Sequence, residues 1–430
     1  MKNEFQQVPW IRNTNVYEVN LRQYTEDGTL ASFIKHLPRL HDMGVDVLWF
    51  MPITPISLKN KKGTLGSYYA CSSYTKFNPE YGTIGEFQDL VRKAHELGMK
   101  VIIDWVANHT GCDHEWTISN PSFYKLNEAG EFYDSHGWDD VIDLDYENQE
   151  MRIELIKAMN YWIDTFNIDG FRCDMAMLTP VDFWFQARTA LDQEGPLFWL
   201  AELDPLDDPA YMEIFDAAYT WRWMNTAKNF KQEGARNIQP LREVLHSYQY
   251  ILPSSASPAW FTSNHDENSW NGTEYEKYGE MAIPLAVFSS IWKGLPLLYS
   301  GQELPNLKRL EFFDKDQIEW IDHPTLHSFY KKLFSFRKDN LVFSVPQDEQ
   351  HCYGVRNSVD HHILSFIRKA GDYEILIVIN FSEYTLQNVE VQLGNSRGVF
   401  EELFSSSTQE FNHAQQYFNL EPWAYQIWYQ

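Results

Sequence analysis

Acidic side chains follow two short apolar runs near the middle of the chain. The run 170–173 contains Arg172 and ends at Asp174, and the run 198–200 leads to Glu202. Apolar runs of this length between helical patterns are typical of strands buried on both faces. Successive strands that each carry a carboxylate at the carboxyl end are typical of the rim of a barrel active site. Taken alone, each acid could equally be a helix cap or a solvated loop residue.

Paired carboxylates point to a definite chemistry. Two carboxyl groups flanking a glycosidic bond are what sugar hydrolysis requires, one attacking the anomeric carbon and the other protonating the leaving oxygen. Arg172 lies two residues before Asp174, on the same side of the strand, and should lower the pKa of Asp174 and keep it ionised as a nucleophile. Glu202, if less solvated and near negative neighbours, should hold its proton as a general acid.

Further polar residues follow two other predicted strands. Asp104 and His109 come at and after the third strand, and His265 and Asp266 follow the seventh. Each has an ordinary alternative, such as a buried structural acid, a hydrogen-bonded core histidine or a loop cap. Because carboxyl ends of barrel strands meet at one rim, we expect these side chains to converge on one pocket with Asp174 and Glu202.

The elements that would position these residues alternate regularly between strand and helix. Predicted strands cover residues 16–21, 45–51, 101–106, 170–174, 198–203, 217–221, 259–263 and 295–299. Predicted helices cover residues 30–43, 86–97, 151–166, 180–192, 274–293 and 325–339. Eight strands alternating with helices predict an α/β fold, a (β/α)₈ TIM barrel. A doubly wound open sheet shares the alternation, but usually has fewer repeats and a glycine-rich dinucleotide turn, and neither that turn nor a Walker motif occurs here.

Two segments depart from this alternation. Residues 110–147 are rich in Asn, Asp, Gly, His and aromatic residues without a long periodic element, and we interpret them as a short inserted domain after strand 3. From residue 345 to 430, strand patterns separated by turn residues predict a C-terminal antiparallel β-sandwich domain. Residues 1–109 and 148–344 would then form the barrel.

Composition restricts the partners. The net charge of −25 argues against nucleic acid and against anionic membranes, because a phosphate backbone needs clustered Lys and Arg. The 16 Trp and 24 Tyr residues exceed what an ordinary core needs, and exposed aromatic rings could stack on sugars, although surplus aromatics also simply pack. The sequence leaves the oligomeric state open.

Cysteine usage, the N-terminus and hydropathy give no sign of secretion or membrane insertion. The four cysteines form no Cys-x-x-Cys pattern, and the histidines of 110–147 lack a ligand motif such as His-Glu-x-x-His. The first ten residues do not have the pattern of a signal peptide, and the longest apolar segment, 282–292, is too short to span a bilayer. We expect a cytoplasmic protein, although a secreted chain whose leader had been removed would look the same.

Several motifs together resemble the signature regions of the α-amylase family of glycoside hydrolases. They are Asp-Trp-Val-Ala-Asn-His at 104–109, Gly-Phe-Arg-Cys-Asp at 170–174, Glu202 after a strand, and Phe-Thr-Ser-Asn-His-Asp at 261–266. Segments 44–52 and 294–303 resemble the family's second-strand and eighth-strand regions. The resemblance covers roughly residues 10–340 and implies a barrel, an inserted domain and a C-terminal β-sandwich.

The resemblance also implies roles for individual residues. Asp174 would be the nucleophile, Glu202 the general acid/base and Asp266 the stabiliser of the transition state. The implied substrate-binding residues are Tyr69, Asp104, His109, Arg172 and His265. A retaining mechanism implies that the carboxyl groups of Asp174 and Glu202 lie about 5–5.5 Å apart.

Some positions depart from the family pattern. Ser73 replaces a usual aspartate, and Met177 replaces a lysine that contacts the leaving-side sugar in many α-amylases, so specificity stays open. Asn108 and Asp143 fall where many relatives bind structural calcium, and ordinary loop hydrogen bonding is the alternative role for both. No cofactor is expected for the chemistry itself.

From these observations we expect a retaining hydrolase of α-1,4-glucosidic bonds in maltooligosaccharides or other α-glucans. A transglycosylase or an α-1,6-acting enzyme of the same family is the first alternative. A non-catalytic carbohydrate-binding or partner-stabilising relative is another, although such relatives lose the acids that this chain keeps at Asp174, Glu202 and Asp266.

Overall fold

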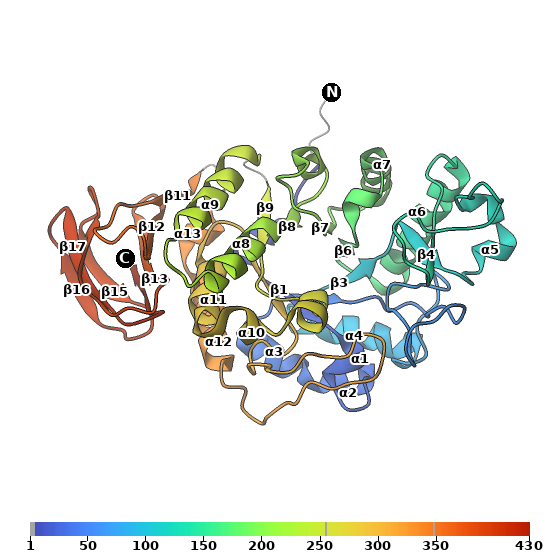
Figure 1. Ribbon diagram of the computed structural model, residues 1–430, viewed down its shortest axis with the longest axis horizontal. Helices are drawn as coiled ribbons and strands as arrows, with labels where there is room; N and C mark the ends of the chain where they lie inside the picture. Colours follow the sequence, from blue (N-terminus) through green and yellow to red (C-terminus); the bar gives the residue numbers. More distant parts are fainter. Residues whose placement is uncertain (1–4, 254–255, 347–348) are drawn as a thin grey trace.

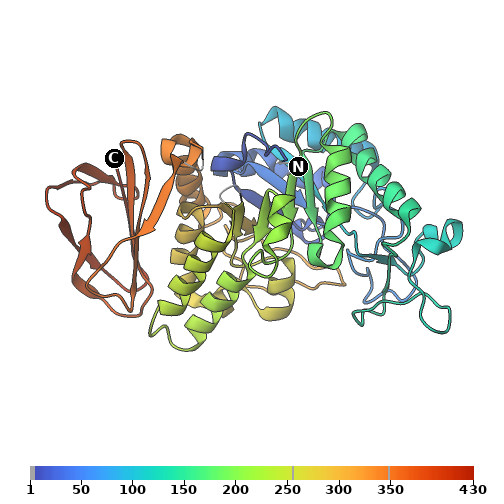
Figure 2. The same ribbon diagram turned by 90° about the horizontal axis from the view of Figure 1, so that it is seen from above.

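The computed structural model describes residues 5–253, 256–346 and 349–430. A barrel of parallel strands forms the middle of the molecule (Figure 1). The C-terminal antiparallel sheets lie at one end and the segment carrying β4 and α5 at the other, an arrangement that is also clear from above (Figure 2). The four cysteines are free.

Eight parallel strands close the barrel, in the order β1-β10-β9-β8-β7-β6-β3-β2. Their bounds are β1 Val16–Val19, β2 Val47–Phe50, β3 Lys100–Trp105, β6 Gly170–Cys173, β7 Phe198–Ala201, β8 Ala217–Tyr219, β9 Ser257–Trp260 and β10 Leu295–Tyr299. Almost every residue in these strands is buried, which explains why they are continuous apolar runs rather than alternating patterns. The predicted TIM-barrel fold class is confirmed.

Helices surround the barrel. The longer ones are α4 Ile84–Glu96, α6 Gln149–Phe166, α7 Val181–Leu191, α8 Trp221–Gln232, α9 Gln239–Ile251, α11 Ala282–Ile291 and α12 His327–Asp339. The shorter ones are α1 Leu21–Tyr24, α2 Leu30–Phe33, α3 Leu37–Met43, α5 Trp116–Ser119, α10 Glu274–Tyr278 and α13 Leu341–Ser344. The single helix expected over 274–293 is broken after α10, because Gly279 has a φ of 55° and ends that helix.

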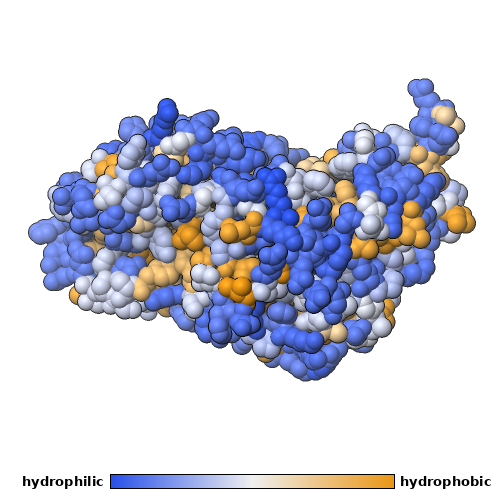
Figure 3. Space-filling view, turned by 60° about the horizontal axis from the view of Figure 1, so that its bottom comes forward, coloured by the Kyte–Doolittle hydropathy of each residue, from blue (hydrophilic) through white to orange (hydrophobic). Residues whose placement is uncertain are grey.

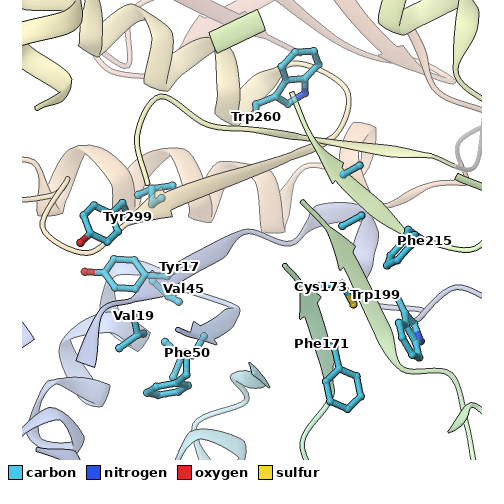
Figure 4. Close-up of a cluster of buried hydrophobic side chains, with 14 of the residues drawn as sticks. Tyr17, Val19, Val45, Phe50, Phe171, Cys173, Trp199, Phe215, Trp260 and Tyr299 are labelled. Carbon is cyan, nitrogen blue, oxygen red and sulfur yellow. The ribbon is translucent and has the colours of Figure 1, made fainter. Parts of the chain in front are cut away.

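Two apolar layers hold the strands in place. One lies between the strands and the helices, and Figure 4 shows aromatic members of it, including Tyr17, Phe50, Trp199 and Trp260. The other fills the barrel interior with side chains such as Trp49 and Phe198. Packing on both faces fixes the strands, so the residues just beyond their carboxyl ends are held in defined positions.

The C-terminal part contains a six-stranded antiparallel sheet of order β11-β12-β13-β18-β15-β16 and a separate pair, β14 and β17. The bounds are β11 His351–Gly354, β12 Ile363–Ala370, β13 Tyr373–Asn380, β14 Leu386–Gln392, β15 Gly398–Glu402, β16 Thr408–Phe411, β17 Gln415–Leu420 and β18 Tyr425–Tyr429. Apolar side chains from both sheets share one core, as the sandwich expectation requires.

The segment after β3 forms a small antiparallel pair, β4 His109–Gly111 and β5 Val141–Asp143. Hydrophilic residues cover most of the face in Figure 3, and hydrophobic residues form smaller separate groups on it. Within the described residues, no helix is both long and apolar enough to cross a membrane.

Candidate active site

A single buried guanidinium brings together three of the predicted acids. Arg172 Nη1 lies 2.9 Å from Asp104 Oδ1 and 2.9 Å from Asp174 Oδ1. Arg172 Nη2 lies 2.9 Å from Glu202 Oε2. The acids come from the ends of three adjacent strands, β3, β6 and β7. One positive charge therefore faces three carboxylates in a site from which water is largely excluded.

Burial and, after it, the excess of negative charge determine the protonation of the acids. Burial raises the pKa of Asp174 to about 6, and Arg172 offsets only part of that increase. Arg172 does lower the pKa of Asp174, as expected, but burial outweighs this effect and repulsion from Asp104 adds to the increase, so the net pKa lies above its ordinary value. Burial raises the pKa of Glu202 further, to about 7, with Asp174 and Asp266 adding to the effect.

The backbone after β6 also holds Glu202. The amide of Met175 donates a hydrogen bond of 2.7 Å to Glu202 Oε2. Met175 adopts a left-handed conformation with φ of 38° and ψ of 49°, which is costly for a residue with a side chain. Strained backbone beside reacting groups is common in active sites, and here it directs an N–H at one carboxylate oxygen.

His265 links three other groups. Its Nδ1 contacts the buried carboxylate of Glu18, and its Nε2 lies 2.7 Å from the Tyr69 hydroxyl and 3.3 Å from Asp266 Oδ2. Although burial lowers the pKa of His265, Asp266 and Glu18 together raise it well above its ordinary value. Burial raises the pKa of Asp266, but its contact with His265 outweighs that effect and keeps the pKa below its ordinary value.

A cavity of about 310 Å³ opens over these acids. Five of the predicted site residues line it: Tyr69, His109, Asp174, Glu202 and Asp266. The other three, Asp104, Arg172 and His265, do not line the cavity but contact residues that do. A larger depression of about 770 Å³ lies between α4 and α6 on the outside of the barrel and contains none of these residues.

His109 and the two candidate calcium ligands, Asn108 and Asp143, lie in the inserted segment or just before it, where the chain leaves β3. Burial lowers the pKa of His109 to about 4, so its ring is neutral. Asp143 Oδ2 accepts hydrogen bonds from Ser135 and lies 3.1 Å from the Lys125 ammonium. That ammonium already neutralises Asp143, and the described residues contain no group of three or more His, Cys, Asp or Glu side chains suited to a metal. Lys125 thus pairs with one oxygen of Asp143, while the buried Asp143 Oδ1 has no hydrogen-bond partner.

Several lining residues escaped the sequence analysis. They are Lys62, Ser67, Trp138, Asp140, Val141, Met175, Trp270, Phe312 and Phe313. Most lie in loops without periodicity, so no local pattern distinguishes them. Glu18, which contacts His265, could have been recognised from the sequence, because it is the one charged residue in the otherwise apolar strand β1.

An eight-stranded parallel barrel with carboxylates gathered in one cavity at the carboxyl ends of its strands is the architecture of barrel glycosidases. The family model of the alpha amylase catalytic domain matches residues 12–123 and 118–319. The chain therefore belongs to the alpha-amylase family and is a glycosidase.

Individual relatives agree with this assignment. Alpha-amylase 3 of Dictyoglomus thermophilum is 30% identical, over 87% of this chain and 86% of its own length. Alpha-amylase MalA of Haloarcula japonica is 25% identical over 86% of this chain, which spans only 56% of MalA. Among solved structures, the noncanonic maltogenic alpha-amylase AmyB from Thermotoga neapolitana superposes with a TM-score of 0.88 at 28% identity, covering 97% of this chain and 98% of its own.

Proposed function

We propose that the chain is a retaining hydrolase of α-1,4-glucosidic bonds in maltooligosaccharides. The observation that carries the proposal is that Asp174, Glu202 and Asp266, which are far apart in sequence, line one cavity. The guanidinium of Arg172 further joins Asp174 to Glu202. Relatives named as alpha-amylases support the glucan as substrate.

In the first step Glu202 donates its proton to the glycosidic oxygen while a carboxylate oxygen of Asp174 attacks the anomeric carbon. The bond between that carbon and the leaving oxygen breaks, and a covalent glycosyl–Asp174 ester forms. In the second step Glu202 accepts a proton from water, which attacks the same carbon and releases Asp174. Two inversions give net retention of configuration.

The protonation states fit these roles. Near neutral pH Asp174, with a pKa of about 6, is mostly ionised, while Glu202, with a pKa of about 7, keeps much of its proton. Glu202 Oε2 is occupied by Arg172 and the Met175 amide, so Oε1 is the oxygen we assign to proton transfer.

The remaining residues would bind or position. Asp266, whose side chain is 41% exposed towards the cavity it lines, is suited to accept hydrogen bonds from sugar hydroxyls. Tyr69 and His109 present rings and polar atoms to the same space. Arg172, Asp104 and His265 act through their contacts: Arg172 orients the two reacting carboxyls, and His265 orients Asp266.

Maltoheptaose tests the proposal. The wild-type protein should release reducing sugar from it, and Asp174→Asn should abolish the release, since an amide is a poor nucleophile. Nuclear magnetic resonance should show the α anomer as the first product. Equal rates for the two proteins, or a β product, would refute the proposal. Chromatography of products distinguishes hydrolysis from glucosyl transfer, and isomaltooligosaccharides test for α-1,6 cleavage.

A further inference from the structure

The loop after β2 forms a strap along one side of the active-site cavity. We use the name 58–66 strap for residues 58–66, which leave the barrel after β2 and precede α4. Lys62 of the strap lines the cavity together with Asp174 and Glu202. What the strap touches at its two ends determines how much of a sugar chain the cavity can hold.

At one end the strap is fastened to the inserted segment. Asp113 Oδ2 accepts hydrogen bonds of 2.9 Å from the backbone amides of Leu58 and Lys59. The Lys62 ammonium lies 3.0 Å from Asp139 and 2.8 Å from Asp140. Because Asp140 lines the cavity as well, the wall is continuous from the inserted segment to the strap.

At the other end the strap is fastened to the loop after β10. The Leu65 amide donates a hydrogen bond of 2.9 Å to Phe313 O, and the Thr64 amide donates one of 2.7 Å to Asp314 Oδ1. A Cβ on Gly63 would stand 2.6 Å from Phe313 Cβ, so the two loops are in close contact there. Phe312 and Phe313 continue the wall on this side.

The barrel order places this wall relative to the proton donor. β2 and β10 both neighbour β1, and β7, which carries Glu202, lies four strands from β1 in either direction around the closed barrel. The strap and the β10 loop therefore lie on the far side of the barrel from Glu202, whereas the inserted segment follows β3, two strands from β7. The leaving oxygen must lie next to the group that protonates it, so the sugar on the other side of the scissile bond extends towards the wall.

We propose that the 58–66 strap closes the side of the cavity that receives the non-reducing end of the glucan. The enzyme then works from chain ends, taking in few glucosyl units before the cut and releasing short products from the non-reducing end. The volume of about 310 Å³ supports this, since it lies at the lower limit of ligand cavities, which run from about 300 to 1,000 Å³. This inference rests on the proposed α-1,4-glucan hydrolysis.

Substrates with a blocked end test the inference directly. One maltoheptaoside carries a 2-chloro-4-nitrophenyl group at the reducing end, and its partner also carries a 4,6-O-benzylidene group on the terminal non-reducing glucose. An enzyme that cuts within the chain accepts both. We expect the wild-type protein to hydrolyse the blocked substrate at least about 100-fold more slowly, because the added ring meets the wall.

Weakening the side-chain contacts of the strap should relax this selectivity, while the backbone hydrogen bonds to Asp113 and Phe313 remain. The double variant Lys62→Ala/Asp314→Ala removes its ion pairs to the inserted segment and its side-chain acceptor on the β10 loop. In this variant the hydrolysis rate of the blocked substrate, divided by that of the unblocked substrate, should be at least about tenfold higher than in the wild-type protein. Lys76→Ala is the matched control, because Lys76 pairs with Glu115 of the inserted segment but does not line the cavity; its ratio should stay at the wild-type value.

Each result has one meaning. Comparable wild-type rates on both substrates would overturn the inference while leaving α-1,4 hydrolysis intact, and that measurement needs no variant to fold. The wild-type protein could discriminate against the blocked substrate while the folded double variant shows the same ratio of blocked to unblocked rates. That result would overturn the role of the strap. No hydrolysis of the unblocked substrate would instead overturn the proposed function.

Discussion

The number of carboxylates around Arg172 governs the chemistry at the residue scale. Asp104, Asp174 and Glu202 all lie at ion-pair distance from one guanidinium that is buried inside the barrel. A cation shared in this way orients the reacting acids but cannot hold all of them ionised at low pH. The sequence places Arg172 two residues before Asp174, but it does not show that Asp104 and Glu202 contact the same guanidinium. These contacts depend on which strands are neighbours in the closed barrel.

The pH dependence of activity should follow from these shifts. Activity should rise as the pH increases through about 6, where Asp174 loses its proton, and fall above about 7, where Glu202 loses the proton it must donate. A profile of kcat/KM on maltoheptaose should therefore be bell-shaped with a maximum between these values. In Glu202→Gln the alkaline limb should disappear from the residual activity; its persistence would assign that limb to another group.

The leaving group separates the roles of the two acids. Glu202→Gln should lower kcat on maltoheptaose by about 10²- to 10⁴-fold, the usual contribution of general acid catalysis. Its first turnover on 2-chloro-4-nitrophenyl maltotrioside should fall much less, because a stabilised phenolate leaves without a proton. Asp174→Asn should lose both activities, since both need the nucleophile. Equal losses for Glu202→Gln on the two substrates would contradict its role as the acid.

At the element scale, the ends of strands were far easier to predict than the loops beyond them. The sequence located all eight barrel strands within a few residues, because a buried parallel strand is a short apolar run between helices. It missed α8, because the predicted strand 217–221 was extended to Trp221, where α8 begins, and it also missed α9. In the C-terminal part, strand patterns at 361–367, 374–381, 385–393, 398–403 and 425–429 predicted β12, β13, β14, β15 and β18. They did not predict β11, β16 or β17, although β17 alternates strictly between exposed and buried residues.

The cavity wall illustrates what the sequence could not supply. Tyr69 was found through the family resemblance, whereas Lys62, Phe312 and Phe313 belong to loops far apart in the chain with no periodic pattern. Their meeting depends on hydrogen bonds between loops, such as that from Leu65 to Phe313.

The inserted segment should be stable without calcium. Lys125 provides the cation for the buried carboxylate of Asp143, so treatment with EDTA should leave the melting temperature and the activity unchanged. Lys125→Ala should lower the free energy of unfolding by about 1–3 kcal/mol, because it leaves a buried acceptor without its charged partner. Lys157→Ala, which removes an exposed pair with Glu154 on α6, is the control and should cost less than about 1 kcal/mol. A lower melting temperature in EDTA would show that a metal binds after all.

At the scale of the whole molecule, the C-terminal sheets are packed against the barrel helices rather than tethered to them. Trp292, just after α11, meets Phe366 of β12 with ring centroids 4.7 Å apart. Phe336 of α12 meets Tyr429 of β18 at 5.1 Å. The two contacts join aromatic residues that lie more than 70 positions apart in the chain, and no local sequence pattern encodes them. They indicate that the sheets support the helices behind β10, and hence the strand end next to the strap.

Arg368 should be the most sensitive point of this junction. Its buried guanidinium donates hydrogen bonds to Ile291 O at 2.8 Å and to Trp292 O at 3.4 Å, and so satisfies carbonyls at the carboxyl end of α11. Arg368→Ala should lower the free energy of unfolding by about 2–3 kcal/mol in urea titrations, because hydrogen bonds from a charged donor are lost and the carbonyls stay buried. The neighbouring Lys369→Ala removes a pair with Glu374, which is buried but keeps its hydrogen bonds from Ser396 and Gln430, and should cost less than Arg368→Ala. Because the junction is shared, barrel and sheets should still unfold together in Arg368→Ala; two separate transitions, with the barrel unshifted, would show that the sheets do not stabilise it.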